Sequence, residues 1–180
     1  MLLSPERSIL AVVHLQTRLV PAVIESDAVV KRCVILIKAA QRLDVPVVVM
    51  ELNRQGLGPS VAEIAALVPP DDTIEGQSFS LATEPAVMSR LDENQRNQCV
   101  ICGLEAHVCV LQSALGLAAK GYHVAVVADA TSSRRREDHQ ATITRLAQAG
   151  VIIATTEMVV FEWLQHAGAP AFKELLALIK

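Results

Sequence analysis

Short hydrophobic runs alternate with longer segments of helical periodicity along the whole chain. Val45–Met50 and Val124–Ala128 are nearly continuous hydrophobic runs, which are typical of strands buried on both faces of a sheet. Between such runs, hydrophobic residues recur at helical spacing, as they do in Ala28–Leu43. The pattern predicts strands at Ile9–His14, Val47–Glu51, Thr73–Glu75, Cys99–Gly103, His123–Ala128 and Val151–Ala154.

The segments between these strands carry helix start and stop signals. Gly121 suits the position just after a helix, and Ser60 is expected to cap a helix that follows the turn-rich segment Gln55–Pro59. A loop is expected through Ser132–Ser133. The pattern predicts helices at Ala28–Leu43, Val61–Leu67, Glu84–Asn94, Ala106–Gly121, Glu137–Ala149, Val159–Ala167 and Pro170–Ile179.

The alternation of strands and helices indicates an α/β fold with a parallel, doubly wound sheet, for which we expect the strand order 3-2-1-4-5-6. Ligands bind such sheets beyond the carboxyl ends of the strands, where the winding reverses. The chain has no linker, repeat or low-complexity segment, so residues 1–180 are expected to form a single domain. A chain of this length buries roughly 70% of the surface that its unfolded form exposes.

Composition and charge exclude several classes of partner. The net charge is −3 and the isoelectric point is about 5.9, so the chain lacks the basic footprint of a nucleic-acid-binding protein. Arg134–Arg136 is followed at once by Glu137 and Asp138, and we interpret it as a solvated helix start rather than an anion site. No hydrophobic run approaches the ~18 residues that span a bilayer, so no membrane partner is expected.

The cysteines indicate a reducing compartment. Four cysteines occur without a recognisable secretory signal, which predicts reduced thiols and a cytoplasmic location. Cys99 and Cys102 form a C-x-x-C pattern within an expected strand. Because residues three apart on a strand face opposite sides of the sheet, this pair is unsuited to a disulfide or to a shared metal.

Candidate chemistry centres on Cys109 and His14. Cys109 is expected in the first turn of the helix after the fourth strand, where unpaired amides and the helix dipole favour a thiolate. His14 ends the first strand, which neighbours the fourth in the expected order, so the two side chains could form a nucleophile–base dyad. The alternative is structural, because free cysteine is among the most buried residue types and a partly buried histidine is common.

No cofactor or metal is expected. The chain has neither a G-x-G-x-x-G pattern nor a phosphate-binding loop, and its histidines and cysteines lack ligand-like spacing. His107 lies two positions from Cys109, so on a helix the two side chains diverge. We interpret His107 as a residue that lines the pocket or its loop.

The segment Gly103–Gln112, Gly-Leu-Glu-Ala-His-Val-Cys-Val-Leu-Gln, resembles the nucleophile motif of the isochorismatase-like cysteine hydrolases. Gln55–Pro59, Asp129–Ser133 and the stretch from Thr156 to Trp163 support this resemblance, which covers essentially the whole chain. It implies a three-layer α/β/α sandwich around a six-stranded parallel sheet. It also implies assembly into a homo-oligomer, which is common in the family.

The resemblance further implies an Asp-Lys-Cys triad, and this chain departs from it at two positions. His14 occupies the position of the aspartate and Gly76 that of the lysine, whereas Cys109 is retained. A cis peptide is expected at Leu104–Glu105, and the backbone amides of Glu105 and Cys109 would form the oxyanion hole. The pocket-lining candidates are Gln16, Phe79 and His107.

Two functional hypotheses follow from this comparison. The first is a hydrolase that attacks a small amide, ester or enol-ether-like substrate through Cys109, with His14 in place of the aspartate. The second is a catalytically silent member of the family that binds a small molecule or serves as an oligomeric scaffold. Loss of both members of a buried ion pair avoids the roughly 3–5 kcal/mol penalty of losing only one, so stability does not discriminate between the hypotheses. Nicotinamidase activity is not expected, because no histidine follows the second strand in Glu51–Gly56.

Overall fold

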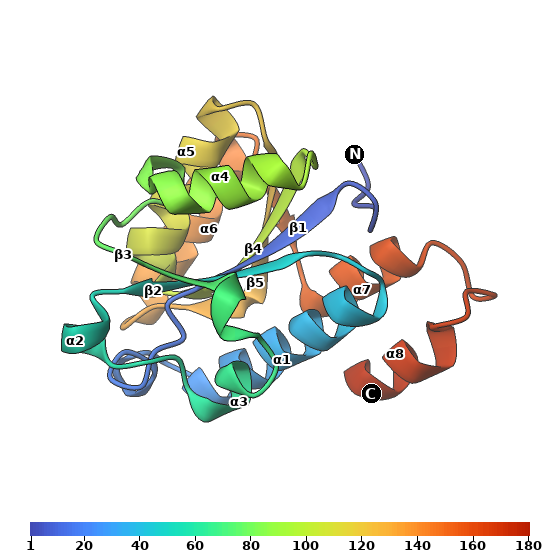
Figure 1. The fold of residues 1–180 in the computed structure, drawn as a ribbon, viewed down its shortest axis with the longest axis horizontal. Helices are drawn as coiled ribbons and strands as arrows, with labels where there is room; N and C mark the ends of the chain where they lie inside the picture. Colours follow the sequence, from blue (N-terminus) through green and yellow to red (C-terminus); the bar gives the residue numbers. More distant parts are fainter.

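The computed structural model describes residues 1–180 and contains one six-stranded sheet (Figure 1). All neighbouring strands pair in parallel, and their order is β3-β2-β1-β4-β5-β6, which confirms the predicted fold class. The strands are β1 (Ser8–Val13), β2 (Val47–Leu52), β3 (Thr73–Gly76), β4 (Gln98–Leu104), β5 (His123–Ser132) and β6 (Ile152–Ala154).

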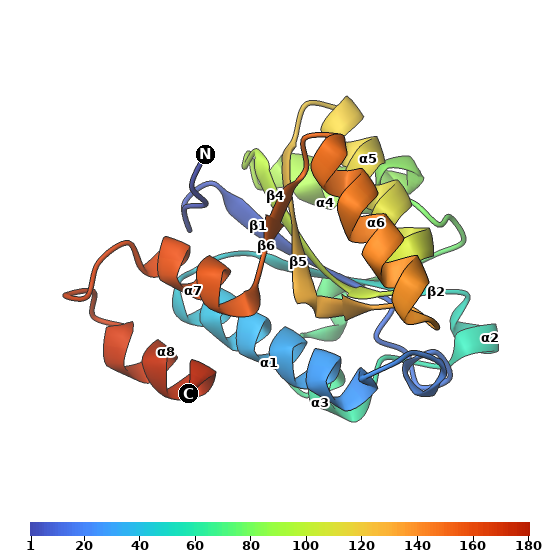
Figure 2. The same ribbon diagram turned by 180° about the vertical axis from the view of Figure 1, so that it is seen from behind.

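Helices cover both faces of the sheet and form a three-layer sandwich (Figures 1 and 2). The helices α1, α3, α7 and α8 contribute to the hydrophobic core on one face, and α4, α5 and α6 contribute to the core on the other. The helices are α1 (Ser26–Arg42), α2 (Arg54–Leu57), α3 (Ala62–Ala65), α4 (Pro85–Glu93), α5 (Leu111–Ala119), α6 (Arg136–Gln148), α7 (Thr156–Leu164) and α8 (Phe172–Ile179). A π-helical turn, Ala106–Val110, precedes α5.

The two central strands are buried along their full length, as their hydrophobic runs predict. Successive side chains of β4 enter opposite cores: Cys99 lies in the core beneath α4 and α5, and Cys102 lies in the core beneath α1. The expectation that these two cysteines face opposite sides of the sheet is therefore confirmed. No helix has the combination of length and hydrophobicity needed to cross a bilayer.

Three local predictions differ from the structure. The loop expected at Ser132–Ser133 begins later, because a bulge in the pairing between β4 and β5 keeps Thr131 opposite Gly103 and Ser132 opposite Leu104. Ser60 does not cap α3, since its hydroxyl and its backbone N–H both bind the Glu51 carboxylate.

The third difference concerns the start of α7. The helix begins at Thr156 rather than at Val159. The side chain of Thr155 accepts a hydrogen bond from the backbone N–H of Met158, which is the usual role of a threonine in an N-cap. The cap adds most of a turn of helix in front of the hydrophobic residues from which the helix was predicted.

Candidate active site

The candidate site lies where the carboxyl ends of β1 and β4 meet. In the register of these strands, Val13 lies opposite Gly103, and His14 follows directly. Gly103 adopts a φ of +111°, and a Cβ atom at this position would lie only 2.1 Å from the carbonyl oxygen of Val13. The glycine thus allows β1 and the nucleophile loop to approach more closely than any other residue would.

Cys109 lies in the π-helical turn Ala106–Val110 rather than in the first turn of a regular α-helix. The backbone N–H groups of Val108 and Val110 donate to the carbonyl of Glu105, which holds the turn against the loop. The Leu104–Glu105 peptide is cis, which confirms the expectation drawn from the resemblance.

The prediction that Cys109 is a thiolate is wrong for this structure. The residue is only 3% exposed, and burial together with the negative charge of Glu105 raises the pKa of its thiol to about 12. A hydrogen bond from the Glu105 backbone lowers this pKa, but by less. The favourable position at the start of a helix is outweighed by desolvation, so the thiol is protonated at neutral pH.

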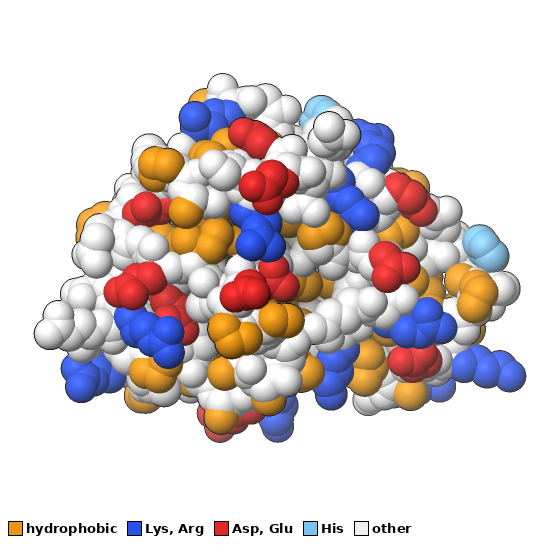
Figure 3. Space-filling view, in the orientation of Figure 1, with side chains coloured by type: hydrophobic (Ala, Val, Ile, Leu, Met, Phe, Trp, Pro, Cys, Tyr) orange, Lys and Arg blue, Asp and Glu red, His pale blue; other side chains and the backbone are white.

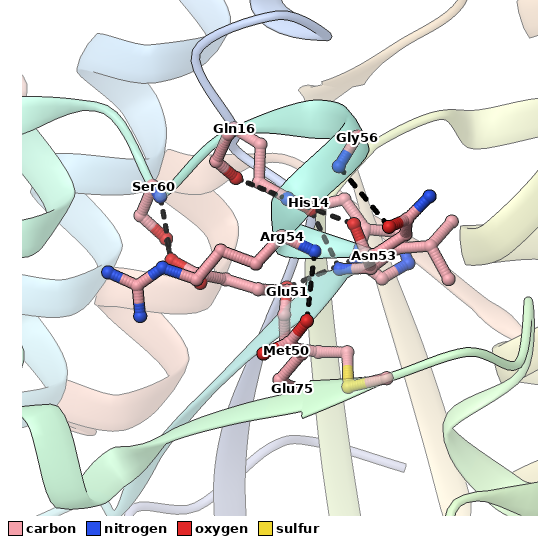
Figure 4. Close-up of polar contacts among 11 residues, drawn as sticks. His14, Gln16, Met50, Glu51, Asn53, Arg54, Gly56, Ser60 and Glu75 are labelled. Atoms are coloured by element: carbon pink, nitrogen blue, oxygen red, sulfur yellow. Dashed lines mark hydrogen bonds and ion pairs between the residues drawn. The ribbon is translucent and has the colours of Figure 1, made fainter.

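His14 is buried and neutral. It is 1% exposed, its φ is +48°, and its Nδ1 lies 3.1 Å from the carbonyl oxygen of Met50. Figure 4 shows His14 and Met50 side by side at the ends of their strands. Because a carbonyl only accepts, Nδ1 carries the proton and Nε2 is left as the acceptor. Burial lowers the pKa of His14 to about 4, against smaller opposing effects from the Met50 carbonyl and the Glu105 charge.

An ion pair that the sequence analysis missed lies beside these two groups. Arg134 donates from Nε to Oε1 of Glu105 at 2.6 Å and from Nη2 to Oε2 at 3.1 Å, and the Glu105 side chain is only 7% exposed. The charge of Glu105 affects the pKa of both His14 and Cys109, so the three groups share one electrostatic environment. One feature of the sequence could have indicated this ion pair, namely a glutamate inside the hydrophobic motif Gly103–Gln112. Its partner was harder to identify, because Arg134–Arg136 suits a solvated helix start equally well.

Other side chains surround Gly76, the position where the resemblance implies a lysine. Gly76 is buried, and a Cβ atom placed on it would lie 2.3 Å from Cε of Met50 and 2.6 Å from Cδ of Glu84. The Glu84 carboxylate accepts hydrogen bonds from the backbone N–H groups of Gln77 and Ser78. The flexible ends of Met50 and Glu84 therefore occupy the space beside Gly76 and would have to move to admit a side chain there.

The three pocket-lining candidates have different surroundings. Gln16 is fully buried and donates its two amide protons to the carbonyls of Leu52 and Gly58, which leaves no donor for a ligand. Phe79 is 51% exposed. The Nδ1 atom of His107 lies 3.0 Å from the hydroxyl of Ser133, so His107 bridges the nucleophile loop and the end of β5.

A second polar cluster lies at the end of β2, on the face of the sheet that α1 and α3 cover (Figure 4). The buried Glu51 binds Ser60 through Oε1, and its Oε2 atom lies 3.4 Å from Nε of Arg54. No group of three or more His, Cys, Asp or Glu side chains in the structure is arranged to hold a metal ion. The cluster anchors the segment between β2 and α3.

Comparisons with known proteins identify the family. The isochorismatase domain model matches residues 8–158. The chain is 36% identical over 179 residues to the mouse (Mus musculus) isochorismatase domain-containing protein 2A, an alignment that covers 98% of this chain and 84% of the mouse protein.

Solved structures share the fold. The MAR1 ribonuclease from Caenorhabditis elegans matches with a TM-score of 0.93 at 30% identity, over 99% of this chain and 92% of the worm chain. The Escherichia coli YcaC gene product, described as an octameric hydrolase of unknown specificity, matches with a TM-score of 0.89 at 22% identity, over 99% of this chain and 87% of its own. Since the domain match spans most of the sequence and the mouse relative aligns over nearly all of it, the chain belongs to the isochorismatase family.

Proposed function

We propose that this protein is a hydrolase in which Cys109 attacks a small amide, ester or enol-ether-like substrate with His14 as the general base. The contact between Nδ1 of His14 and the carbonyl of Met50 is the observation that carries the proposal. Its Nδ1–H donates to Met50 O, so Nε2 is the nitrogen that accepts a proton. The register of β1 and β4 supports the proximity of the two side chains, because Val13 lies opposite Gly103 and His14 follows directly.

With an amide or ester substrate, the reaction begins from a neutral thiol and a neutral imidazole. As the sulfur attacks the substrate carbon, the S–C bond forms, the thiol proton passes to Nε2 of His14, and an electron pair moves onto the carbonyl oxygen. The backbone amides of Glu105 and Cys109 bind that oxygen, and each such donor can contribute about 3 kcal/mol to stabilising the transition state. Collapse of the intermediate expels the leaving group, which takes the proton from the imidazolium and leaves a thioester.

Hydrolysis of the thioester completes the cycle. Water attacks the thioester carbon, His14 accepts a proton from the water, and the thiol leaves with that proton as the acid product forms. The low pKa of His14, about 4, makes its imidazolium a strong acid and its imidazole a weak base. The site therefore favours substrates whose leaving groups need a proton over substrates that need a strongly activated nucleophile.

The ribonuclease designation of the worm protein is not carried over to this chain. Ribonucleases bind a polyanionic backbone, and that binding depends on a positively charged surface. The net charge of −3 and the even mixture of acidic and basic residues argue for a small uncharged or weakly charged substrate instead.

The rate of Cys109 alkylation tests the dyad. In the wild type, the rate of iodoacetamide addition to Cys109, followed by peptide mass spectrometry, should rise about tenfold between pH 3 and 5 and then level off up to pH 8, because neutral His14 assists the attack. His14→Gln should abolish that step. The matched control is His123→Gln, which removes an exposed imidazole at the start of β5 and should leave the profile unchanged. An unassisted thiol would instead react tenfold faster with each pH unit and show no plateau between pH 5 and 8. Such a profile in the wild type would contradict the dyad.

The second candidate is a catalytically silent protein, and the surroundings of Gly76 favour it. The ends of the Met50 and Glu84 side chains lie too close to a Cβ atom at position 76 for a side chain to enter without moving them. Restoring the family pattern therefore requires His14→Asp, Gly76→Lys and Met50→Ala together, with Glu84 left to pair with the new ammonium.

The restored triple variant is expected to hydrolyse members of an amide and ester library at least tenfold faster than the wild type, as judged by product release and by the mass of an acyl adduct on Cys109. The matched control replaces Gly76→Lys by Gly76→Ala, which adds the Cβ atom without the charge. Adducts and turnover in the restored variant alone would show that the natural protein is silent. Turnover in the wild type would support the hydrolase.

We also propose that the protein is a homo-oligomer, as the octameric description of the E. coli protein suggests for this fold. A cytoplasmic location, expected from the four cysteines, remains a prediction. All four are free thiols in the structure.

A further inference from the structure

A small cleft at the end of β2 has a buried carboxylate in its lining. Its volume is about 150 Å³, and residues of β2, α2, α3 and β3 line it. Glu51, in the lining, is only 2% exposed. The space-filling view shows acidic and basic side chains next to each other on the surface at the left, where β2 ends and α2 begins (Figures 1 and 3). The cleft therefore combines a buried negative charge with a charged part of the surface.

The two oxygen atoms of the Glu51 carboxylate have different surroundings. Oε1 accepts hydrogen bonds from the backbone N–H of Ser60 at 2.6 Å and from the Ser60 hydroxyl at 2.8 Å. Oε2 is buried and accepts no hydrogen bond from any protein group, and no other buried side-chain nitrogen or oxygen atom of the chain is in this situation. A buried carboxylate oxygen without a donor is unfavourable, and native structures rarely contain one. Because the two bonds to Ser60 fix the carboxylate, Oε2 is held in place as an acceptor for an external donor.

Arg54 lies beside Oε2 without forming a hydrogen bond to it. The Nε atom of Arg54 is 3.4 Å from Oε2, but the geometry is not that of a hydrogen bond. Figure 4 shows the Arg54 side chain running past the Glu51 carboxylate towards Ser60. Since 57% of this side chain is exposed, the guanidinium can turn into solvent without breaking a hydrogen bond to Glu51. A cation with N–H groups of better fit can then take its place.

The rest of the lining favours an alkylammonium ion over a metal ion. Ile64, Ala65 and Val68 supply hydrocarbon, and the cleft contains no second carboxylate, no histidine and no cysteine. A divalent metal ion needs several such ligands or many oxygen atoms around it. The volume is well below the ~300–1,000 Å³ of a site for drug-sized ligands. One carboxylate, hydrocarbon walls and a small volume together fit a primary amine with a few carbon atoms.

We propose that this cleft binds a small primary alkylammonium ion, whose N–H groups donate to Oε2 of Glu51 in place of the Arg54 guanidinium. The hydrocarbon tail of the ligand lies against Ile64 and Val68, which are buried in the core beneath α1 and α3. Cys109 belongs to the core on the other face of the sheet. The proposal is therefore independent of the Cys109 chemistry.

A titration with n-propylammonium chloride tests the proposal. The backbone N–H of Ser60 donates to the same carboxylate, so its NMR signal reports on a donor that arrives at Oε2. We expect this signal to shift and saturate with a dissociation constant of about 1–10 mM, because only a few ligand atoms make contact. Tetramethylammonium chloride has the same charge but no N–H group, and it should leave the Ser60 signal unchanged at equal concentration.

Four variants assign the binding to the cleft. Glu51→Gln removes the charge and should raise the dissociation constant about tenfold or more. Glu63→Gln is the matched control, because it removes an exposed carboxylate of α3 outside the lining and should leave the constant within about twofold of the wild type. Ala65→Leu fills the cleft and should abolish binding, and it keeps the test valid if Glu51→Gln does not fold. Arg54→Gln should lower the constant about threefold or more, because the guanidinium no longer competes for Oε2.

Three outcomes would overturn the proposal. The first is equal binding of propylammonium and tetramethylammonium, or equal binding by the wild type and Ala65→Leu. The second is a Ser60 signal that does not move up to about 100 mM propylammonium in either the wild type or Arg54→Gln, since Oε2 then needs no ligand. The third is weaker binding by a folded Arg54→Gln variant, which would make the arginine a partner of Glu51 and not a competitor of the ligand. Circular dichroism of every variant checks folding.

Discussion

Raising the pH from 9 to 11 is expected to lower the free energy of unfolding by about 5 kcal/mol through Cys99 and Cys109 alone. Burial raises the pKa of each thiol to about 12, from an ordinary value near 9. Between these values the unfolded chain loses its thiol protons while the folded chain keeps them. The stabilisation that each thiol adds to the free energy of unfolding is therefore complete below pH 9 and is lost as the pH rises toward 12. Cys33, whose pKa burial also raises, acts in the same direction.

This loss is about a third or more of the total stability of an ordinary domain, about 5–15 kcal/mol, so a large fall in the urea midpoint is expected over this pH range. Urea titrations under reducing conditions at pH 8, 9, 10 and 11 measure it. The double variant Cys99→Ala/Cys109→Ala is the matched control, because lysines and tyrosines titrate equally in both proteins. Its stability should fall by about 5 kcal/mol less over the same range. Equal pH dependence in the two proteins would show that these thiols are not buried as the structure has them.

The fold could be predicted because continuous hydrophobic runs in the sequence indicate the strands that are buried on both faces of the sheet. Ser8–Val13 and Gln98–Leu104 are buried at every position, and a strand buried on both faces has no polar alternation that could be confused with a surface element. The end of β5 was missed for a related reason. Thr131 and Ser132 are polar, but they pair with the nucleophile loop through a bulge that depends on the neighbouring strand.

The candidate site could be predicted only as far as strand order determines it. The order 3-2-1-4-5-6 brings His14 and the Cys109 loop to neighbouring strand ends, and that follows from the pattern of elements. The protonation states do not follow from it. They depend on how deeply the tertiary structure buries both groups and on Glu105, whose partner Arg134 lies 29 residues away.

The surroundings of Gly76 show the same limit more sharply. A glycine at position 76, where the resemblance implies a lysine, indicates only that no ammonium is expected there. Met50 from β2 and Glu84 from the start of α4 fill the space, and no local pattern connects these three positions. What replaces a lost side chain is a property of packing, which sequence periodicity does not encode.

Gly103→Ala is expected to lower the free energy of unfolding by about 4 kcal/mol or more. The new Cβ atom would lie 2.1 Å from the carbonyl oxygen of Val13, 2.8 Å from its nitrogen and 2.9 Å from its carbonyl carbon. These are backbone atoms of the neighbouring central strand, so the clash is relieved only by moving β1 away from β4. The φ of +111° adds strain for any residue with a Cβ atom.

Gly121→Ala is the matched control, because it separates the two causes. Its φ is +93°, yet a Cβ atom there would have nothing within 4 Å, so only backbone strain of about 1–2 kcal/mol is expected. The difference between the two variants, measured by urea denaturation, is then the effect of the close approach between β1 and β4. Because that approach also holds His14 beside the nucleophile loop, Gly103→Ala should remove the His14-dependent step in Cys109 alkylation, whereas Gly121→Ala should keep it. If Gly103→Ala and Gly121→Ala lowered the free energy of unfolding equally, β1 and β4 could separate at the site without cost. The close approach of these strands would then no longer explain how His14 is held beside the nucleophile loop.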